Sequence, residues 1–230
     1  MNDKHVMTAN IVRVPGSRAA KARSVGQTHW LTARAHSLWD RGRALAGTPA
    51  QTYLRAQGID FCPAGLRYLS KCPVGTGSEP RSHPAIISAL HDEDGLVALE
   101  QTFLSGDGRE LATIDRPKRI IGFPVGGLGR WGFTPQRVLR LTDTLEEAAS
   151  AMVVGSQGIP VWPVFSCERY ILVDIPASIR HIIIYARFNP EVAAAIVRAT
   201  AHLTANGRSL EVQYPPDDES WNTYLRRVRS

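Results

Sequence analysis

Short apolar runs alternate with helical segments in the C-terminal half of the chain, and this alternation constrains the fold more than any other feature. We predict strands at 138–141, 160–165, 170–175, 181–186 and 210–213, and helices at 144–153, 190–205 and 219–229. Strands that are apolar on both faces are typical of a parallel sheet covered by helices on each side. The C-terminal half is therefore predicted to be an α/β domain.

A sheet of this kind also predicts where a ligand would bind. In parallel sheets, ligands bind in a crevice beyond the carboxyl ends of the strands. The turns at 142–147 and 186–191 each follow a predicted strand. We therefore expect their side chains to line one crevice.

The first 60 residues follow a different pattern. We expect a flexible basic arm at 1–27 and an amphipathic helix at 30–46. A second helix is expected to have Thr48 as its N-cap, Pro49 in its first turn and Gly58 at its end. These are local signals, and they predict a helical region before the first strand.

The middle of the chain contains short strand-like runs separated by turn signals at Asp94-Gly95 and 106–108, which predict a small antiparallel sheet. The glycines of 126–129 are not followed by a helical pattern, so a turn or a close backbone approach is favoured over a phosphate cradle. The expected division is an arm at 1–27, an α+β region at 28–136 and an α/β domain at 137–230.

Positive charge is concentrated near the N-terminus. Residues 1–60 hold nine Lys and Arg against three Asp, and this surplus equals the net charge of +6 of the whole chain. The remaining residues hold 18 basic and 18 acidic side chains. Such asymmetry indicates a polyanion as partner, and a merely solvated arm is the alternative.

Composition excludes several other classes. No run approaches the roughly 18–20 apolar residues of a membrane span, and residues 1–24 lack the apolar core of a secretory signal. The three cysteines show no paired spacing, which fits a reducing compartment. We therefore expect a cytoplasmic protein that makes no membrane contact.

A series of motifs resembles the Toprim domain of bacterial phage- and plasmid-type primases and the region that accompanies it. Residues 42–59 (GRALAGTPAQTYLRAQGI) are similar to the family's G-T-x-A-x-x-Y-L-x-x-R-G-I run. Further matches are QTFL at 101–104 with DG at 107–108, PKRIIG at 117–122, PVW at 160–162, and PP at 215–216 before WNTYL at 221–225. The resemblance covers about 30–228 and implies a Toprim-like (Rossmann-like), mostly parallel sheet and a role in DNA replication.

The chain departs from this family where the chemistry is expected. The resemblance implies an acid–base glutamate after the first strand and an Asp-x-Asp that holds Mg²⁺ after a later strand. Here Asp143 takes the position of the glutamate, Glu146 keeps its matching type, and Arg187 and Asn189 replace the acidic pair. The family's N-terminal zinc-binding domain is also not expected. We interpret the chain as a degenerate Toprim protein in which Asp143 and Glu146 are vestigial catalytic candidates.

This departure decides the cofactor prediction. Mg²⁺ requires oxygen ligands that usually include carboxylates, whereas Arg187 has no lone pair and is permanently charged. We therefore predict no cofactor, with Mg²⁺ bound only if the chain is an active enzyme in which Asn189 is a weak ligand. Alternatively, Arg187 binds phosphate directly, or it forms a structural ion pair with Glu191 or Asp143.

The candidate nucleic-acid-binding residues are basic side chains and one tryptophan that is expected to be exposed beside the Gly-rich turn. They are Arg18, Lys21, Arg23, Arg34, Arg41, Arg43, Arg130, Trp131 and Arg187. Single-stranded DNA is the favoured partner, because phosphates meet the charges and bases stack on the aromatic ring. A replication helicase or another replication protein is a further expected partner.

Three functions remain open from the sequence. The first is a catalytically impaired, primase-like protein that binds nucleic acid in DNA replication or in the maintenance of a plasmid or phage. The second is an active, metal-dependent primase or nucleotidyltransferase. The third is a protein-interaction module without nucleic-acid binding, whose basic arm docks on an acidic partner.

Overall fold

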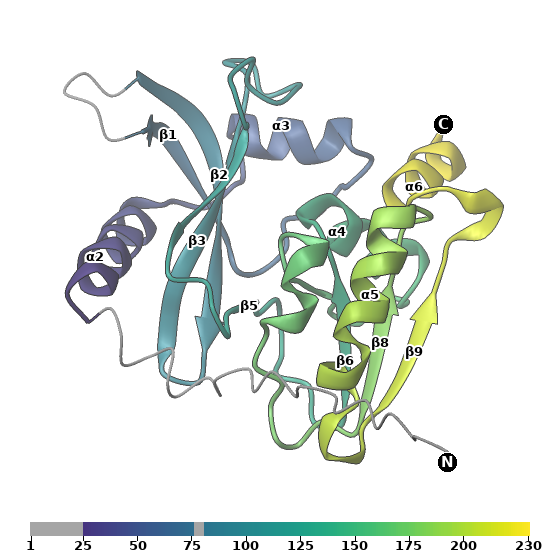
Figure 1. The fold of residues 1–230 in the computed structure, drawn as a ribbon. Helices are drawn as coiled ribbons and strands as arrows, with labels where there is room; N and C mark the ends of the chain where they lie inside the picture. Colours follow the sequence, from purple (N-terminus) through teal and green to yellow (C-terminus); the bar gives the residue numbers. More distant parts are fainter. Residues whose placement is uncertain (1–24, 76–80) are drawn as a thin grey trace, which may run out of the picture.

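The computed structural model describes residues 25–75 and 81–230, so most of the expected basic arm lies outside the described residues. Two sheets lie side by side, each with its own helices (Figure 1). The first sheet is antiparallel and belongs to the N-terminal half, and the second is parallel and belongs to the C-terminal half. The predicted fold class, an α/β unit preceded by a small α+β region, is confirmed.

Helix α2 (Val25–Arg41) covers one face of the antiparallel sheet (Figure 1). Its residues Ala35 and Leu38 belong to a buried cluster with apolar side chains of the strands. The helix ends at Arg41 rather than near residue 46. At Gly42 the chain passes so close to the sheet that a Cβ atom would lie 2.7 Å from the Cβ atom of Arg67. This close approach gives a physical reason for the early end.

Helix α3 (Pro49–Ala56) begins as its sequence predicts. The hydroxyl of Thr48 accepts a hydrogen bond from the backbone N–H of Ala50, and Pro49 occupies the first turn. Tyr53 and Leu54 are buried. These local signals were sufficient because N-caps and first-turn prolines act within a few residues of the helix start.

Within residues 25–75 and 81–230, the antiparallel sheet contains five strands. They are β1 (Leu66–Val74), β2 (Arg81–Asp92), β3 (Gly95–Phe103), β4 (Lys118–Gly122) and β5 (Leu128–Gly129). The first four are neighbours in sequence order, and β5 pairs with β2. The predicted turn before β3 is stabilised by Asp92, whose Oδ1 accepts hydrogen bonds from the N–H groups of Asp94 and Gly95 at 2.8 and 3.2 Å.

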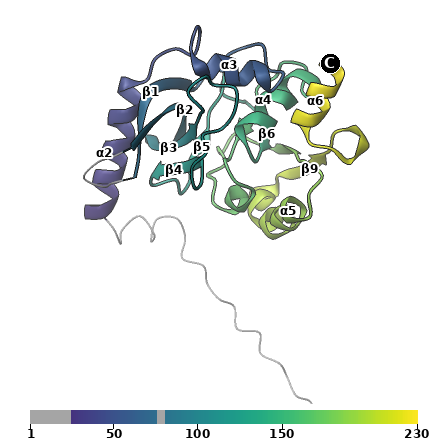
Figure 2. The same cartoon turned by 90° about the horizontal axis from the view of Figure 1, so that it is seen from above.

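The parallel sheet has the strand order β7-β6-β8-β9. Its strands are β6 (Val138–Thr142), β7 (Trp162–Pro163), β8 (His181–Tyr185) and β9 (Ser209–Gln213). Helices α4 (Leu145–Val154) and α6 (Trp221–Arg229) lie on one face, and α5 (Pro190–Leu203) lies on the other (Figure 2). The prediction of a parallel sheet with helices on both faces is therefore correct.

Two strand predictions in this half differ from the structure: the strand at 170–175 is not formed, and the strand at 160–165 is shorter than predicted. The run at 170–175 begins in a 3₁₀ helix, η1 (Cys167–Ile171), in which Tyr170 is buried and Ile171 is 48% exposed. The run at 160–165 forms only the two-residue strand β7, in which Pro163 has no N–H group to donate to a longer ladder. Apolar runs of this length do not distinguish such alternatives.

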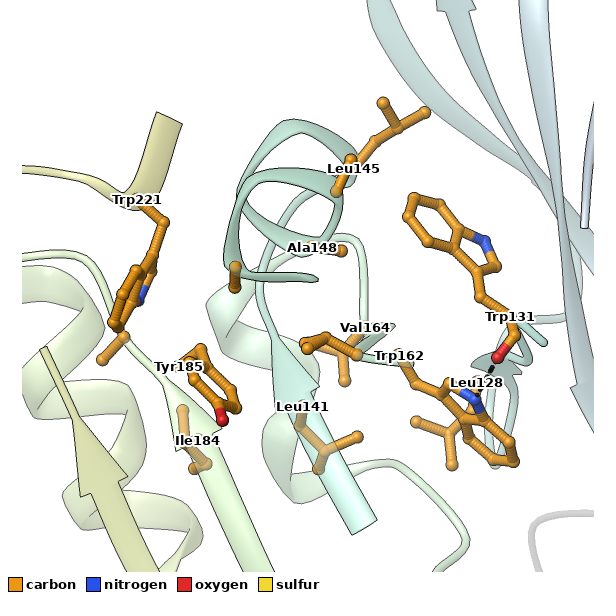
Figure 3. Packing of buried hydrophobic residues seen from close by; sticks show 14 of the residues in the cluster. Leu128, Trp131, Leu141, Leu145, Ala148, Trp162, Val164, Ile184, Tyr185 and Trp221 are labelled. Atoms are coloured by element: carbon orange, nitrogen blue, oxygen red, sulfur yellow. Dashed lines mark hydrogen bonds between the residues drawn. The ribbon is translucent and has the colours of Figure 1, made fainter. Parts of the chain in front are cut away.

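One apolar cluster joins the two sheets (Figure 3). Leu128 and Trp131 from the N-terminal half pack with Trp162 and Val164 from the C-terminal half. The indole Nε1 of Trp162 donates a hydrogen bond to the carbonyl oxygen of Trp131 at 2.9 Å. The two sheets therefore share a core.

The buried guanidinium of Arg169 adds polar contacts to this junction. It donates hydrogen bonds to the carbonyl oxygens of Val164, Pro124 and Gly127 at 2.6, 2.8 and 2.7 Å, and burial lowers its pKa to about 10. At Gly126, a Cβ atom would lie 2.2 Å from Oδ2 of Asp174. The segment 126–129 is therefore a close backbone approach, as predicted.

Candidate functional site

The carboxyl ends of β6 and β8 form the site that the sequence predicted. The two strands are parallel neighbours, so the residues that follow them lie side by side. The hydroxyl of Thr142 donates a hydrogen bond to the carbonyl oxygen of Tyr185 at 2.7 Å and links the two ends. Asp143 follows one strand directly, and Arg187 follows the other after one residue.

An ion pair between Asp143 and Arg187 dominates this site. The Nε of Arg187 donates to Oδ2 of Asp143 at 2.9 Å. The carboxylate side chain is 2% exposed and the guanidinium side chain is 34% exposed. Burial alone would lower the pKa of Arg187, but the charge of Asp143 and its hydrogen bond raise it above the ordinary value. Of the two pairings considered for Arg187, the one with Asp143 is present.

Each member of the pair keeps unused hydrogen-bonding capacity. Oδ1 of Asp143 is buried and has no hydrogen-bond partner within residues 25–75 and 81–230. In the same described ranges, no hydrogen bond is found from the two Nη groups of Arg187. The pair therefore orients a guanidinium whose outer edge can still bind an anion.

Asn189 does not lie free at the site as a metal ligand. It is the N-cap of α5, and its Oδ1 accepts hydrogen bonds from the N–H groups of Glu191 and Val192 at 2.8 and 3.2 Å. Pro190 occupies the first turn of the same helix. The amide oxygen is thus engaged by its own helix, and Asn189 has a capping role in this structure.

Glu146 is directed into the junction between the two sheets. Its carboxylate accepts hydrogen bonds from the hydroxyl of Tyr53 at 2.6 Å and from Nζ of Lys118 at 2.5 Å. Burial would raise the pKa of Glu146, but the charge of Lys118 and these hydrogen bonds lower it below the ordinary value. Glu146 is therefore a buried, paired carboxylate that links α4 to α3 and β4.

A second buried carboxylate, Glu100, lies in the same cluster and was not identified from the sequence. Its side chain accepts a hydrogen bond from the hydroxyl of Thr102 at 3.0 Å. Burial, with a smaller contribution from the charge of Glu146, raises the pKa of Glu100 to about 7, although Lys118 acts in the opposite direction. The available signal was an acidic residue inside the otherwise apolar run of 96–104.

Apart from Arg187, the basic candidates that the structure describes are spread over the N-terminal half. Arg34 donates to the carbonyl oxygen of Gly75 at 3.0 Å, Arg41 is exposed, and Arg43 lies over the ring of Tyr68 at 5.2 Å. Arg18, Lys21 and Arg23 lie outside the described residues. The structure does not bring Arg34, Arg41 and Arg43 next to the Asp143–Arg187 pair, because they belong to α2 and the segment that leads to α3.

Trp131 is not an exposed stacking surface, which corrects the prediction. It is 1% exposed, and its indole N–H lies 3.4 Å from the hydroxyl of Ser88. Its flanking residues suggested exposure, but the ring lies in the core between the two sheets (Figure 3). The neighbouring Arg130 is half-buried and donates to the carbonyl oxygen of Asp92 at 2.7 Å.

The polar groups at this site do not fit Mg²⁺. Asp143 is paired with a cation, Asn189 caps a helix, and Oε2 of Glu147 accepts the N–H of Trp221 at 2.7 Å. Within the described ranges, no three His, Cys, Asp or Glu side chains are arranged to hold a metal ion. A divalent ion about 4 Å from Arg187 would meet a repulsion of roughly 8 kcal/mol at an effective dielectric near 20.

Comparisons with known proteins support the fold. A family model described as a domain of unknown function (DUF7146) matches residues 29–131. No curated protein matches the chain. Along the described residues, no helix is both long and apolar enough to span a bilayer.

The similar solved structures are primase domains. A DNA primase domain from Pseudomonas aeruginosa is 14% identical with a TM-score of 0.54, and the match covers 86% of this chain and 74% of that one. The DnaG catalytic core is 11% identical with a TM-score of 0.56, over 86% and 76%. A DnaG primase catalytic domain bound to single-stranded DNA is 12% identical with a TM-score of 0.55, over 86% and 75%. The chain therefore has a primase-like fold.

Proposed function

We propose that this chain is a Toprim-type, primase-like protein that binds nucleic acid, with single-stranded DNA favoured, and that has lost the metal-dependent reaction of the Toprim family. The observation that carries the proposal is the Asp143–Arg187 pair at the carboxyl ends of β6 and β8. A cation occupies the place where a metal would need carboxylates. The fold and the basic N-terminal region support a nucleic-acid role.

Arg187 has a direct part in this proposal. A guanidinium can bind a phosphate through two parallel hydrogen bonds without a metal ion. Asp143 holds the Nε edge and leaves the Nη edge toward solvent, which fits a phosphate of the strand. Asp143 is then a positioning residue for Arg187. The proposed setting is cytoplasmic, in DNA replication or in the maintenance of a bacterial plasmid or phage, with a helicase or another replication protein as partner.

Fluorescence anisotropy of labelled dT20 and U20 over a salt series tests this function, with and without Mg²⁺ at constant ionic strength. If all of the net charge of +6 met phosphates, log affinity would fall against log salt with a slope of about −4. We expect a steep slope and no tightening by Mg²⁺. Arg187→Gln should weaken binding and reduce the slope by about 0.7, with the exposed Arg198→Gln as control.

Two other results would overturn the proposal. Tightening by Mg²⁺, together with primer synthesis that is lost in Asp143→Ala, would establish the active nucleotidyltransferase instead. Absence of binding to either oligonucleotide at low salt would leave the protein-interaction module, whose basic arm meets an acidic partner.

A further inference from the structure

A groove of about 550 Å³ lies at the amino end of β6, the end opposite to the Asp143–Arg187 pair. Its walls come from 133–140 and from Ile159, Pro160 and Trp162. None of the candidate residues that lie within the described ranges contributes to it. The groove is therefore a separate feature of the C-terminal half.

One wall of this groove is an open sheet edge. Strand β7 pairs with Leu141 and Thr142 of β6, whereas β8 pairs with 138–141 on the other side. Among the described residues, 138–140 therefore have no neighbouring strand on the β7 side. Backbone polar groups at such an edge can form hydrogen bonds with a bound molecule.

Exposed apolar side chains lie at the same place. Phe133 is 64% exposed and Ile159 is 37% exposed, and both line the groove. Trp162 closes the groove from the core side, because its side chain is only 2% exposed. An exposed ring beside a hollow offers a flat surface on which a nucleobase can stack.

The charged side chains that line the groove are basic, and they favour an anionic ligand. Arg137 and Arg140 line the groove, and no acidic residue among those that the structure describes does so. The Nε of Arg140 is buried without a hydrogen-bond partner in the described part of the chain. A phosphate oxygen is a strong acceptor for such a donor. A second copy of this chain fits poorly, because each copy would present the same two arginines.

We propose that this groove binds a nucleotide of a single strand, with its base stacked on Phe133 and its phosphate held by Arg137 and Arg140. The inference rests on the proposed nucleic-acid binding and adds a contact surface that is distinct from Arg187. An extended acidic peptide could use the open edge, but the exposed ring and the paired cations together favour a base and its phosphate.

The test is dT20 binding by the full chain and its variants, measured by anisotropy. Phe133→Ala should weaken binding on the order of tenfold, and Phe133→Trp should restore it, because a ring is again available. Arg137→Gln should reduce the salt slope by about 0.7, which corresponds to one phosphate contact on a single strand. Val197→Ala, at a 73% exposed position on α5, is the apolar control, and Arg198→Gln is the charge control.

Photo-crosslinking locates the contact independently. An oligonucleotide that carries 5-iodouracil should crosslink to the tryptic peptide 131–137, which lies between Arg130 and Arg137 and contains Phe133. Because Trp131 in this peptide is buried, Phe133 is the expected acceptor. The crosslink should be lost in Phe133→Ala and should not be competed by free dTMP, which lacks the neighbouring nucleotides of the strand.

The outcomes separate this inference from the proposed function. If the wild-type protein binds dT20 but the groove variants bind equally well, the groove assignment is wrong and the proposed function stands. If free dTMP competes at equal concentration, the groove is a mononucleotide site and the single-strand assignment is wrong. If the wild-type protein does not bind dT20, both the groove assignment and the proposed function are wrong. Binding of a labelled octapeptide of alternating Val and Glu that Phe133→Ala abolishes would then assign the groove to a peptide.

Discussion

Arg187 and Asp143 join the carboxyl ends of two neighbouring parallel strands through a single contact of 2.9 Å between Nε and Oδ2. The carboxylate of Asp143 is almost fully buried, whereas the guanidinium of Arg187 reaches solvent. This asymmetry means that the two residues depend on each other unequally. Without the guanidinium, the buried carboxylate would be an uncompensated charge, whereas the guanidinium can form hydrogen bonds with water if the carboxylate is removed.

Single substitutions of this pair should reveal that asymmetry. Arg187→Gln leaves a buried carboxylate without a cation, so we expect a loss of about 2–3 kcal/mol in the free energy of unfolding. Asp143→Asn leaves a partly exposed guanidinium, and we expect a loss of about 1 kcal/mol. Urea unfolding of both single variants and of the double variant gives the coupling energy. Additive losses would show that the pair does not stabilise the fold.

Replacing Arg187 and Asn189 by aspartates, which gives the Asp-x-Asp pair that the resemblance implies, should create a metal-binding site. In a variant with Arg187→Asp and Asn189→Asp, two carboxylates join Asp143 at the same sheet edge, and Asp still serves as an N-cap. We expect Mg²⁺ to stabilise this variant against urea by about 1.4 kcal/mol at ten times its Kd. Wild type and Arg187→Asp alone are the controls. Equal stabilisation of the wild type by Mg²⁺ would show that its present donors already suffice.

The elements that build this site were predictable because their signals are local. The apolar run before Tyr185 and the sequence Asn189-Pro190 indicated a strand followed by a helix, and the structure has β8 followed by α5. Thr144 was expected to start α4, and it is its N-cap. Parallel pairing then places Asp143 and Arg187 together without further information.

Other parts of the site were not predictable, because they depend on distant contacts. Glu146 was assigned to the crevice, but its partner Tyr53 is 93 positions away and draws it into the junction between the sheets. Trp131 was expected to be exposed from its flanking glycine and arginine, yet it packs between sheets whose relative placement no local pattern specifies. Glu100 was missed for the same reason.

Glu100 should make stability depend on pH. Its pKa of about 7 in the folded chain lies above the ordinary 4.5, so its contribution is fully present below about pH 4.5 and is lost as pH rises through 7. Glu100→Gln removes this loss. We expect the variant to gain on the order of 2–3 kcal/mol over wild type between pH 4.5 and 8.5, measured by urea unfolding. The exposed Glu110→Gln is the control.

A constant difference between Glu100→Gln and wild type across this pH range would contradict the prediction. It would show that the pKa of Glu100 in the folded chain is not raised above its ordinary value. Because Glu100 interacts with Lys118 and Glu146, the difference between the two proteins reports Glu100 together with its effect on these two neighbours.

Arg169 should be essential for the junction between the two sheets. Its guanidinium satisfies three backbone carbonyl oxygens, and no carboxylate pairs with it among the described residues. Arg169→Met removes this donor from the buried carbonyl oxygens of Val164 and Gly127, whereas the carbonyl oxygen of Pro124 still accepts the N–H of Gly127. We therefore expect a loss of about 3–5 kcal/mol in the free energy of unfolding by urea. Arg198→Met, at an exposed ion pair with Glu168, should change stability by less than about 1 kcal/mol. Equal effects of the two substitutions would mean that water replaces the guanidinium, and that the shared apolar core alone holds the sheets together.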